Sequence, residues 1–207
     1  MPSVQPSKFI VLVCGLNIRS HNRITLADQL SLLRSSHGLL AVEAVRDKGS
    51  YLVTTHLNPA GTIQAVVNAL GSRLKEQPSA AVTTTSQVSG ALTKLTANLR
   101  QRYGDAFSEH NFEIDLNEVP WRGGLAFPLY PTELPQIALP FHKTKNAVIL
   151  GVSDGAALIA KREAKNIHWG TTVNDPCKRL IRMIAGVDVA LTSRSGNVMR
   201  DLVNLSS

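Results

Sequence analysis

Short apolar runs and amphipathic stretches alternate over the first 85 residues, and this order constrains the fold more than any other feature of the sequence. Apolar side chains at spacings typical of strands and helices predict six elements in the order strand, helix, strand, strand, helix, strand. They are Phe9–Val13, Thr25–Ser35, Leu40–Val45, Ser50–Thr55, a helix that begins at Pro59 and stops before Pro78, and Ala80–Thr84. Four strands with two helices on one face form the ferredoxin-like, split βαβ arrangement. We therefore expect residues 1–85 to fold as one ferredoxin-like unit.

Residues 86–207 predict a second α+β unit with a similar element order. The expected elements are a helix from Ser86 to about Tyr103, a strand Phe112–Leu116, a hairpin of Ala147–Val152 with Ala156–Lys161, a helix capped by Asp175, a strand Val187–Leu191 and a closing helix. Residues 119–142 hold five prolines, and because proline cannot donate a ladder hydrogen bond, this proline-rich segment is predicted to be a loop insertion. The predicted fold class is therefore α+β, with two tandem ferredoxin-like units at 1–85 and 86–207.

The apolar runs and the cysteines indicate in which part of the cell the protein is found. The longest apolar runs, Phe9–Val13 and Ala147–Val152, are much shorter than the roughly 20 residues that a membrane-spanning helix requires. The N-terminal residues lack the apolar centre of a signal peptide, which favours a short disordered tail and a cytoplasmic location. Cys14 and Cys177 have no neighbours at metal-ligand spacing and are expected to be reduced thiols. No cofactor is predicted, and the sequence leaves both a monomer and a homodimer open.

Positive charge is concentrated in the two ends of the chain, whose formal net charge is +7 and whose pI is about 9.7. Residues 1–104 hold eleven Lys or Arg against four Asp or Glu, residues 105–136 hold one against six, and residues 137–207 hold ten against five. A basic protein attracts polyanions and steers their diffusion towards it. The charge distribution therefore favours an anionic partner without identifying it.

The loop after the first strand has the composition of an anion site. Gly15 and Asn17 suit a tight turn, because both residue types tolerate positive φ. The loop then carries Arg19, His21 and Arg23 towards a helix N-terminus, where backbone N–H groups favour negative charge. An ordinary turn with solvated charges is the alternative interpretation.

Two short motifs, near the beginning and the end of the chain, carry a family resemblance. The first has the matching positions of the pattern L-L-R-G-I-N-V-G-G-x-N at Leu12, Gly15, Asn17 and Asn22. The second has those of the pattern R-N-W-N-T-V-x-K-L at Arg194, Asn197 and Leu202. With these motifs the chain resembles the uncharacterised bacterial family catalogued as domain of unknown function 1697. The resemblance implies a tandem ferredoxin-like α+β fold and no established activity. The chain departs from the patterns where an arginine, two glycines and a tryptophan are replaced by Cys14, Arg19, Ser20 and Gly196.

Residues typical of catalysis or of base stacking are few. The six histidines show no metal-ligand spacing, and nucleophile-elbow, Walker and dinucleotide motifs are absent from the sequence. Cys14 beside His21 could act as a nucleophile, but a cysteine in an apolar strand is more commonly a packed side chain. Val13, Ser50 and Leu52 stand where an RNA-recognition motif would carry aromatic rings, so stacking of bases on this sheet is not expected. An enzyme is therefore not favoured.

Basic residues expected on the surface form the main functional signal. Arg179 and Arg182 lie three apart on a predicted helix and share one face, a spacing suited to phosphate contacts. Arginines and lysines expected to face outward as well are Arg100, Arg102, Lys143, Lys145 and Arg200. Phosphate contacts give a salt-dependent, largely sequence-independent affinity, and the missing rings favour duplexes over single strands. The sequence therefore predicts a non-enzymatic protein that binds double-stranded DNA through phosphates with little sequence specificity. The predicted binding residues are Arg19, His21, Arg23, Arg46, Lys48, Lys161, Arg162, Lys165, Lys178, Arg179, Arg182 and Arg194.

A small anionic ligand is the alternative partner. If the two family motifs face each other, Asn17, Arg19 and Arg194 would converge in a cleft between the two units, where the protein would bind or act on such a ligand. A solvated basic surface without a specific ligand is the third interpretation.

Overall fold

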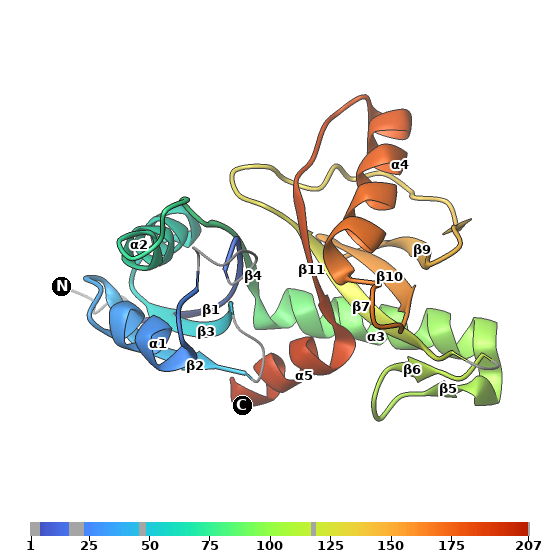
Figure 1. Cartoon of the computed structure of the whole chain (residues 1–207), viewed down its shortest axis with the longest axis horizontal. Coiled ribbons are helices and arrows are strands. Elements are labelled where there is room, and N and C mark those ends of the chain that lie inside the picture. The colour runs from blue at the N-terminus through green and yellow to red at the C-terminus, as the bar shows by residue number, and fades with distance from the viewer. Residues whose placement is uncertain (1–4, 17–22, 46–48, 117–118, 207) are drawn as a thin grey trace. The chain divides into compact units, whose positions relative to one another are not determined.

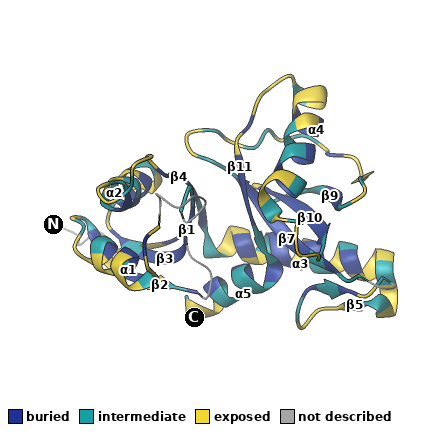
Figure 2. Cartoon of the chain, in the orientation of Figure 1, coloured by how far each residue is buried: buried dark blue, intermediate teal, exposed yellow. Residues whose placement is uncertain are grey.

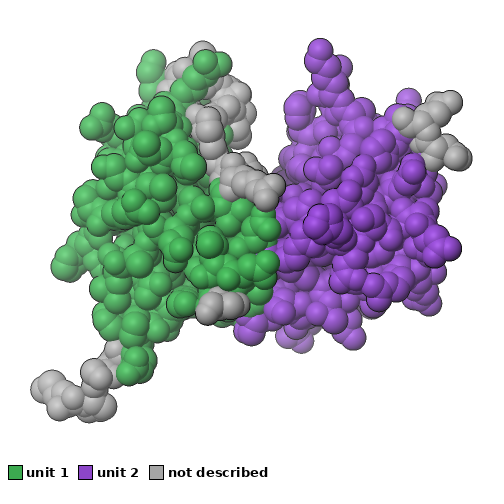
Figure 3. All heavy atoms as spheres, turned by 90° about the horizontal axis from the view of Figure 1, so that it is seen from below, with its two compact units in different colours: residues 1–85, 201–207 green, residues 86–200 purple. Residues whose placement is uncertain are grey.

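The fold is α+β, with two antiparallel sheets and, in the part of the chain described, five α-helices (Figure 1). The computed structural model describes residues 5–16, 23–45, 49–116 and 119–206. The chain divides into two compact units, Met1–Thr85 with Asp201–Ser207, and Ser86–Arg200 (Figure 3). None of the described helices is long and apolar enough to cross a membrane.

Unit 1 contains both ends of the chain. The sequence assigned all of residues 86–207 to the second unit, but Asp201–Ser207 belong to unit 1. Leu202 is fully buried, and Lys8 Nζ donates a hydrogen bond of 2.9 Å to the carbonyl oxygen of Ser206. The hydrogen bond from Lys8 of β1 links the C-terminal turn to unit 1 and is the physical reason for the difference, because the sequence pattern does not show where a terminal helix packs.

Unit 1 has the six elements that the apolar spacing predicts. They are β1 (Ser7–Cys14), α1 (Leu26–Arg34), β2 (Leu39–Ala44), β3 (Ser50–Thr55), α2 (Pro59–Gly71) and β4 (Ser79–Thr84). Thr25 caps α1 by accepting a hydrogen bond of 3.1 Å from Asp28 N–H, and Asn58 caps α2 by accepting one of 2.8 Å from Gly61 N–H. The strand order is β2-β3-β1-β4, and every neighbouring pair is antiparallel.

Both faces of the unit 1 sheet are buried. On one face, Val11 of β1 belongs to a core cluster with Leu33 of α1 and Val66 of α2. On the other face, residues such as Ile10 and Leu52 are buried as well. Ser50 and Leu52, two of the positions where an RNA-recognition motif would carry rings, are at most 2% exposed.

Unit 2 is built on a second sheet, whose path is β5-β6-β7-β10-β9-β8, with β11 paired to β7. Its elements are α3 (Thr85–Tyr103), β5 (Phe107–Ser108), β6 (Glu113–Ile114), β7 (Trp121–Pro128), β8 (His142–Lys143), β9 (Ala147–Ser153), β10 (Ala156–Arg162), α4 (Asp175–Ala185), β11 (Leu191–Ser195) and α5 (Gly196–Leu205). Thr85 at the start of α3 and the last turns of α5 are assigned to unit 1. The turn between β9 and β10 has positive φ at Asp154 (51°) and Gly155 (74°), as expected for a tight hairpin.

The proline-rich segment contains a central strand, which corrects the prediction of a loop over 119–142. β7 pairs with β6, β10 and β11, and most of its residues are buried (Figure 2). The prolines do not prevent this, because Pro120 precedes the strand and Pro128 is its last residue. The remaining prolines lie in the connection from 129 to 141, for which most residues have no regular secondary structure.

Two glycines allow β7 to pack on both faces. A Cβ atom on Gly123 would lie 2.6 Å from Leu99 Cδ1 of α3. A Cβ atom on Gly124 would lie 2.3 Å from the carbonyl oxygen of Arg194 and 2.5 Å from the Trp169 ring. Successive strand residues point to opposite faces. The sheet is therefore covered by α3 on one face and by the segment that precedes α4 on the other.

The region of α4 and the strand after it also differ from the prediction in three respects. A π-helical segment, Gly170–Asn174, runs directly into α4, so Asp175 lies inside a continuous helical path instead of capping its start. Cys177, Leu180 and Ile181 are buried as expected, but Ile184 is 41% exposed. The last strand is β11, which begins at the residue where the predicted strand Val187–Leu191 ends.

The four central strands of unit 2 repeat the order of unit 1. β9-β10-β7-β11 follow one another as β2-β3-β1-β4 do, with antiparallel neighbours throughout. The core on the α4 face joins Ile149, Ile159 and Leu191 of the sheet to Cys177 and Ile181 of α4. The connection 129–141 stands between β7 and β9, where unit 1 has α1 between β1 and β2.

Candidate functional site

Four of the predicted binding residues lie outside the described residues. They are Arg19, His21, Arg46 and Lys48. Asn17, which the small-ligand alternative requires, lies outside them as well. The predicted anion site of the first loop can therefore be followed only at Arg23, which is exposed.

Arg23 and Arg73 line a pocket of about 410 Å³ beside the start of α1. Asp28 lines the same pocket, and its carboxylate accepts a hydrogen bond of 2.6 Å from Thr25 Oγ1. The helix start thus already has a side-chain cap and a carboxylate at its first turn. A second anion at this end of α1 would meet that carboxylate, so the pocket is less favourable to anions than its two arginines alone suggest.

Lys161 is not an external cation, which corrects the sequence prediction. The residue is only 3% exposed, and its Nζ donates to the carbonyl oxygens of Ile167 (3.0 Å) and Arg162 (3.4 Å). The same Nζ lies 2.9 Å from Glu163 Oε1 and 5.3 Å from the centroid of the Trp169 ring. Lys161 therefore anchors the loop after β10, and its burial keeps it from a phosphate group outside.

Arg194, Arg162 and Lys165 differ in how far they are available. Arg194 Nη1 donates to Thr192 Oγ1 and to the carbonyl oxygen of Ser193, both at 2.9 Å, so this guanidinium is engaged along its own strand. Arg162 is half-buried at the end of β10, and Lys165 is exposed in the loop that follows.

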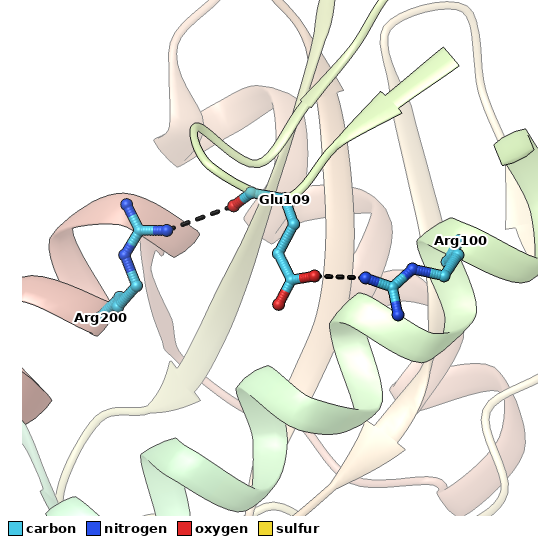
Figure 4. Close-up of polar contacts among 3 residues, drawn as sticks. All are labelled: Arg100, Glu109 and Arg200. Carbon is cyan, nitrogen blue, oxygen red and sulfur yellow. Dashed lines mark hydrogen bonds and ion pairs between the residues drawn. The ribbon is translucent and has the colours of Figure 1, made fainter. Parts of the chain in front are cut away.

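Two other outward cations of the sequence analysis, Arg100 and Arg200, are committed to the acidic segment. Arg100 forms an ion pair with the carboxylate of Glu109 (Figure 4). Arg200 donates to the carbonyl oxygens of Glu109 (3.2 Å) and His110 (2.8 Å), and its guanidinium lies 5.5 Å from the centroid of the Phe112 ring. These contacts connect the acidic segment to α3 and α5, and the Arg100–Glu109 pair is itself mostly exposed.

The positively charged side chains on the outer face of α4 are largely exposed to solvent. Arg179 is exposed and forms no ion pair with any described residue. Arg182 Nε lies 3.5 Å from Asp188 Oδ1, but both side chains are more than 70% exposed. Lys178 Nζ lies 3.8 Å from Asp175 Oδ1. Exposed pairs of this kind contribute about 0–1 kcal/mol, so a phosphate group can replace the carboxylate at little cost.

A polar pocket of about 280 Å³ joins α4 to the turn between β8 and β9. Its lining includes Lys145 and Arg179, together with Thr144, Asn146, Thr171, Thr172, Asp175 and Pro176. The turn is fixed, because Thr144 N–H donates to the Ala147 carbonyl oxygen (2.8 Å) and Ala147 N–H donates to Thr144 Oγ1 (3.0 Å). This closed turn holds the exposed Lys145 at its tip.

A second pocket, of about 570 Å³, lies at the other end of the same turn and is lined by Gln101, Arg102, Tyr103, Phe141 and Lys143. Lys143 of this pocket and Lys145 of the first are two residues apart. We define the cationic stripe as Arg102, Lys143, Lys145, Arg179 and Arg182, which runs from the end of α3 along the β8 edge to α4. Four of its five members form no ion pair with a described residue, and only Arg182 does.

The sequence predicts that all five residues of the cationic stripe are exposed. The predicted binding residues, however, do not include Arg102, Lys143 and Lys145. The signal that could have found them is the Lys-Thr-Lys spacing at 143–145. The pockets that connect the lysines to α3 and α4 depend on tertiary packing, and sequence spacing does not show them.

Two side chains of unit 2, Tyr103 and Cys177, have raised pKa values. Burial raises the pKa of the Tyr103 phenol, opposed in part by the neighbouring Arg102. Burial also raises the pKa of the Cys177 thiol to about 12, whereas Cys14 is a half-buried free thiol at the end of β1. Among the described residues, no group of three or more His, Cys, Asp or Glu side chains is placed to hold a metal ion.

Comparisons with known proteins give a fold and no activity. No protein-family model matches the chain, and no curated protein matches its sequence. The chain is similar in structure to the conserved bacterial protein SP0830 from Streptococcus pneumoniae, with a TM-score of 0.56 and 15% sequence identity. The match covers 98% of this chain and 99% of that chain. At this identity the likeness shows a shared fold over nearly the whole length.

Proposed function

We propose that the protein binds double-stranded DNA through its phosphates, with little sequence specificity, along the cationic stripe of unit 2. The carrying observation is that Lys143 and Lys145, two residues apart, each line a pocket that holds a second exposed cation. The partner cations are Arg102 and Arg179. Lysines and arginines that lack an internal acid keep their charge available for phosphate contacts.

The proposal replaces part of the binding set that the sequence predicted. Arg179 and Arg182 remain, and Lys178 flanks them on the same helix. Lys161 is omitted because it is buried, and Arg194 because it is engaged along its own strand. Arg162 and Lys165 remain predictions at the margin of the site.

A titration of labelled random-sequence duplex DNA, followed by fluorescence anisotropy at several salt concentrations, tests the proposal. We expect the logarithm of the binding constant to fall linearly with the logarithm of salt concentration, with a slope of about 0.9 for each phosphate contact. The double variant Lys145→Ala with Arg179→Ala should weaken binding and make the slope less steep by about 0.9 for each contact removed.

The matched control is Lys94→Ala, which removes an exposed charge on α3 away from both pockets. It should leave both the affinity and the slope close to those of the wild type. Absence of binding at low salt, or an affinity that does not change with salt, would refute the proposal. An equal effect of Lys94→Ala would show that net charge, and not the stripe, determines binding.

The small-ligand alternative is tested in the same assay. Inorganic phosphate at constant ionic strength should not displace the DNA if binding depends on many weak phosphate contacts spread over the stripe. Displacement by low concentrations of phosphate would favour the alternative of a single anion site.

We also infer that the chain consists of two ferredoxin-like units in tandem. The repeated strand order, β2-β3-β1-β4 in unit 1 and β9-β10-β7-β11 in unit 2, supports this inference. In the second unit, the connection 129–141 would take the place of the first helix. Membership of the family of domain of unknown function 1697, the cytoplasmic location and the monomeric or homodimeric state stay predictions.

A further inference from the structure

The pocket at the end of α3 combines cations with aromatic rings, which the rest of the stripe does not. Its lining consists of Gln101, Arg102, Tyr103, Phe141 and Lys143, all from unit 2. Phosphate contacts alone need no aromatic side chain. Proteins that bind unpaired nucleotides, in contrast, place aromatic rings beside a positively charged path for the backbone.

Phe141 is the ring that is placed to stack. It is 44% exposed and lies two residues after the buried Leu139, in the connection 129–141. The Arg102 guanidinium lies 3.8 Å from the ring centroid and so covers one face of the ring. Both side chains line the pocket, where a planar base could lie against the other face of the ring or against the guanidinium plane.

The groups around Phe141 suit the rest of a nucleotide. Lys143 follows two residues later and lines the same pocket, so an ammonium and a guanidinium flank the ring. Tyr103 keeps its proton at neutral pH, since the ordinary pKa of the phenol is 10.0 and burial raises it further. Its hydroxyl and the Gln101 amide can both donate and accept hydrogen bonds, as the edge of a base requires. The pocket volume of about 570 Å³ is in the range of small-ligand sites.

We propose that this pocket holds an unpaired nucleotide at the end of the bound nucleic acid, with the base against Phe141 and the phosphate between Arg102 and Lys143. The inference rests on the proposed function, since the pocket lies at one end of the cationic stripe. It adds a preference that the stripe alone does not provide, namely for duplexes with a single-stranded tail over blunt duplexes.

The test compares a blunt duplex with the same duplex carrying a short single-stranded tail, by anisotropy at one salt concentration. We expect the wild type to bind the tailed duplex between about 5-fold and 150-fold more tightly, the range that stacking of one base provides. Phe141→Ala should abolish this difference, and the variant should still bind the blunt duplex. Because Phe141 is already 44% exposed, the variant should remain folded, which a thermal unfolding curve checks.

The matched control is Tyr130→Ala, which removes another exposed aromatic side chain of the same proline-rich connection. It should keep the preference for the tail. Equal binding of tailed and blunt duplexes by the wild type would overturn this inference and leave the proposed function standing. Failure to bind either duplex would overturn the proposed function and the inference together.

A free nucleotide would present the same groups, a base and a phosphate, to this pocket. Phe141→Trp places a fluorophore in the pocket, and its emission can be titrated with AMP and with ribose 5-phosphate as the control without a base. Quenching by AMP alone, together with tighter binding of the tailed duplex, supports the inference. Quenching by AMP from a protein that binds neither duplex would assign the pocket to a free nucleotide and overturn the inference.

Discussion

Lys161 shows that a lysine in a basic stretch of sequence can be buried in the structure. Its sequence context, Lys161-Arg162 followed by Lys165, is that of a basic surface, yet its ammonium group is enclosed by two carbonyl oxygens and a carboxylate. A buried ammonium group is tolerated only with such partners. Tertiary packing decides the outcome, because residues on both faces of β10 are buried and Lys161 lies beside Trp169.

Lys161→Met should therefore destabilise the protein by about 1–3 kcal/mol, because the carbonyl oxygen of Ile167 loses its charged donor and Glu163 loses its cation. Lys165→Met, four residues away and exposed, should change the free energy of unfolding by less than about 0.5 kcal/mol. Urea unfolding followed by tryptophan fluorescence measures both. Equal stability of the two variants would show that the Lys161 contacts contribute nothing net.

Cys177 gives a prediction on pH. Burial raises the pKa of its thiol from an ordinary value of 9.0 to about 12, so the folded protein holds the proton at pH values where the unfolded chain releases it. The stability that comes from the neutral buried thiol is complete below about pH 9 and is lost as the pH rises towards 12. Cys177→Ala should therefore flatten the loss of stability between these pH values, measured by urea unfolding.

The same burial predicts selective labelling. At pH 8, iodoacetamide should modify the half-buried Cys14 of the native protein well before Cys177, and mass spectrometry of peptides would separate the two sites. Modification of Cys177 should require unfolding, since its side chain is fully buried. Comparable rates in native protein would contradict the packing of α4 against the sheet.

Among the elements, β7 depends most on small residues. Gly123 and Gly124 are neighbours in the strand and face opposite sides of the sheet. Gly123 faces the end of the Leu99 side chain, and Gly124 faces the Arg194 carbonyl oxygen and the Trp169 ring. A leucine terminus can rotate away from an added methyl group, whereas a paired strand cannot. The two positions therefore differ in what a substitution costs, although their sequence context is nearly the same.

Gly124→Ala should destabilise the protein by about 1–3 kcal/mol or more, the usual cost of overpacking a filled core. Gly123→Ala should cost clearly less, because Leu99 can change rotamer. Thermal unfolding of the two variants provides the comparison, with each serving as the control for the other. A larger loss for Gly123→Ala would mean that α3 is held more rigidly than the neighbouring strand.

How far the elements could be predicted depends on whether apolar periodicity alone defines them. It does so in unit 1, where capped helices and short alternating strands leave few choices, and in α3, where Val88, Leu95 and Leu99 are buried as expected. It fails at β7, since five prolines in 119–142 outweighed the proline-free run from Trp121 to Phe127. It also fails at β11, whose residues are mostly polar and are specified by pairing with β7.

The candidate site could be predicted in part for a similar reason. Arg179 and Arg182 follow from helical spacing, which needs no tertiary information. The pockets at Lys143 and Lys145 need the packing of α3 and α4 against an edge strand of two residues, and so short a strand has no recognisable pattern. Phe141 was hidden in a segment that the prolines led us to interpret as an insertion.

For the whole molecule, the C-terminal residues of the chain matter more than the sequence suggested. Leu202 is fully buried in a segment assigned to unit 1, whereas Leu205 of the same helix is 39% exposed. Leu202→Ala should destabilise unit 1 by about 2–5 kcal/mol, the cost of a cavity left by a buried leucine. Hydrogen exchange of the β1 amides would report this loss, and Leu205→Ala should leave it nearly unchanged. Unaltered exchange in the Leu202 variant would show that unit 1 does not require the C-terminal segment.

The pairing of β7 also determines when during synthesis unit 2 can form. Its neighbours β10 and β11 are made about 30 and 70 residues later, so a chain still growing on the ribosome presents one edge of β7, from Gly124 to Pro128, unpaired until Ser195 has left the exit tunnel. The four strands of unit 1 are complete by Thr84 and have no such delay. Nascent chains stalled before residue 190 should therefore bind holdase chaperones through the stretch from Trp121 to Pro128.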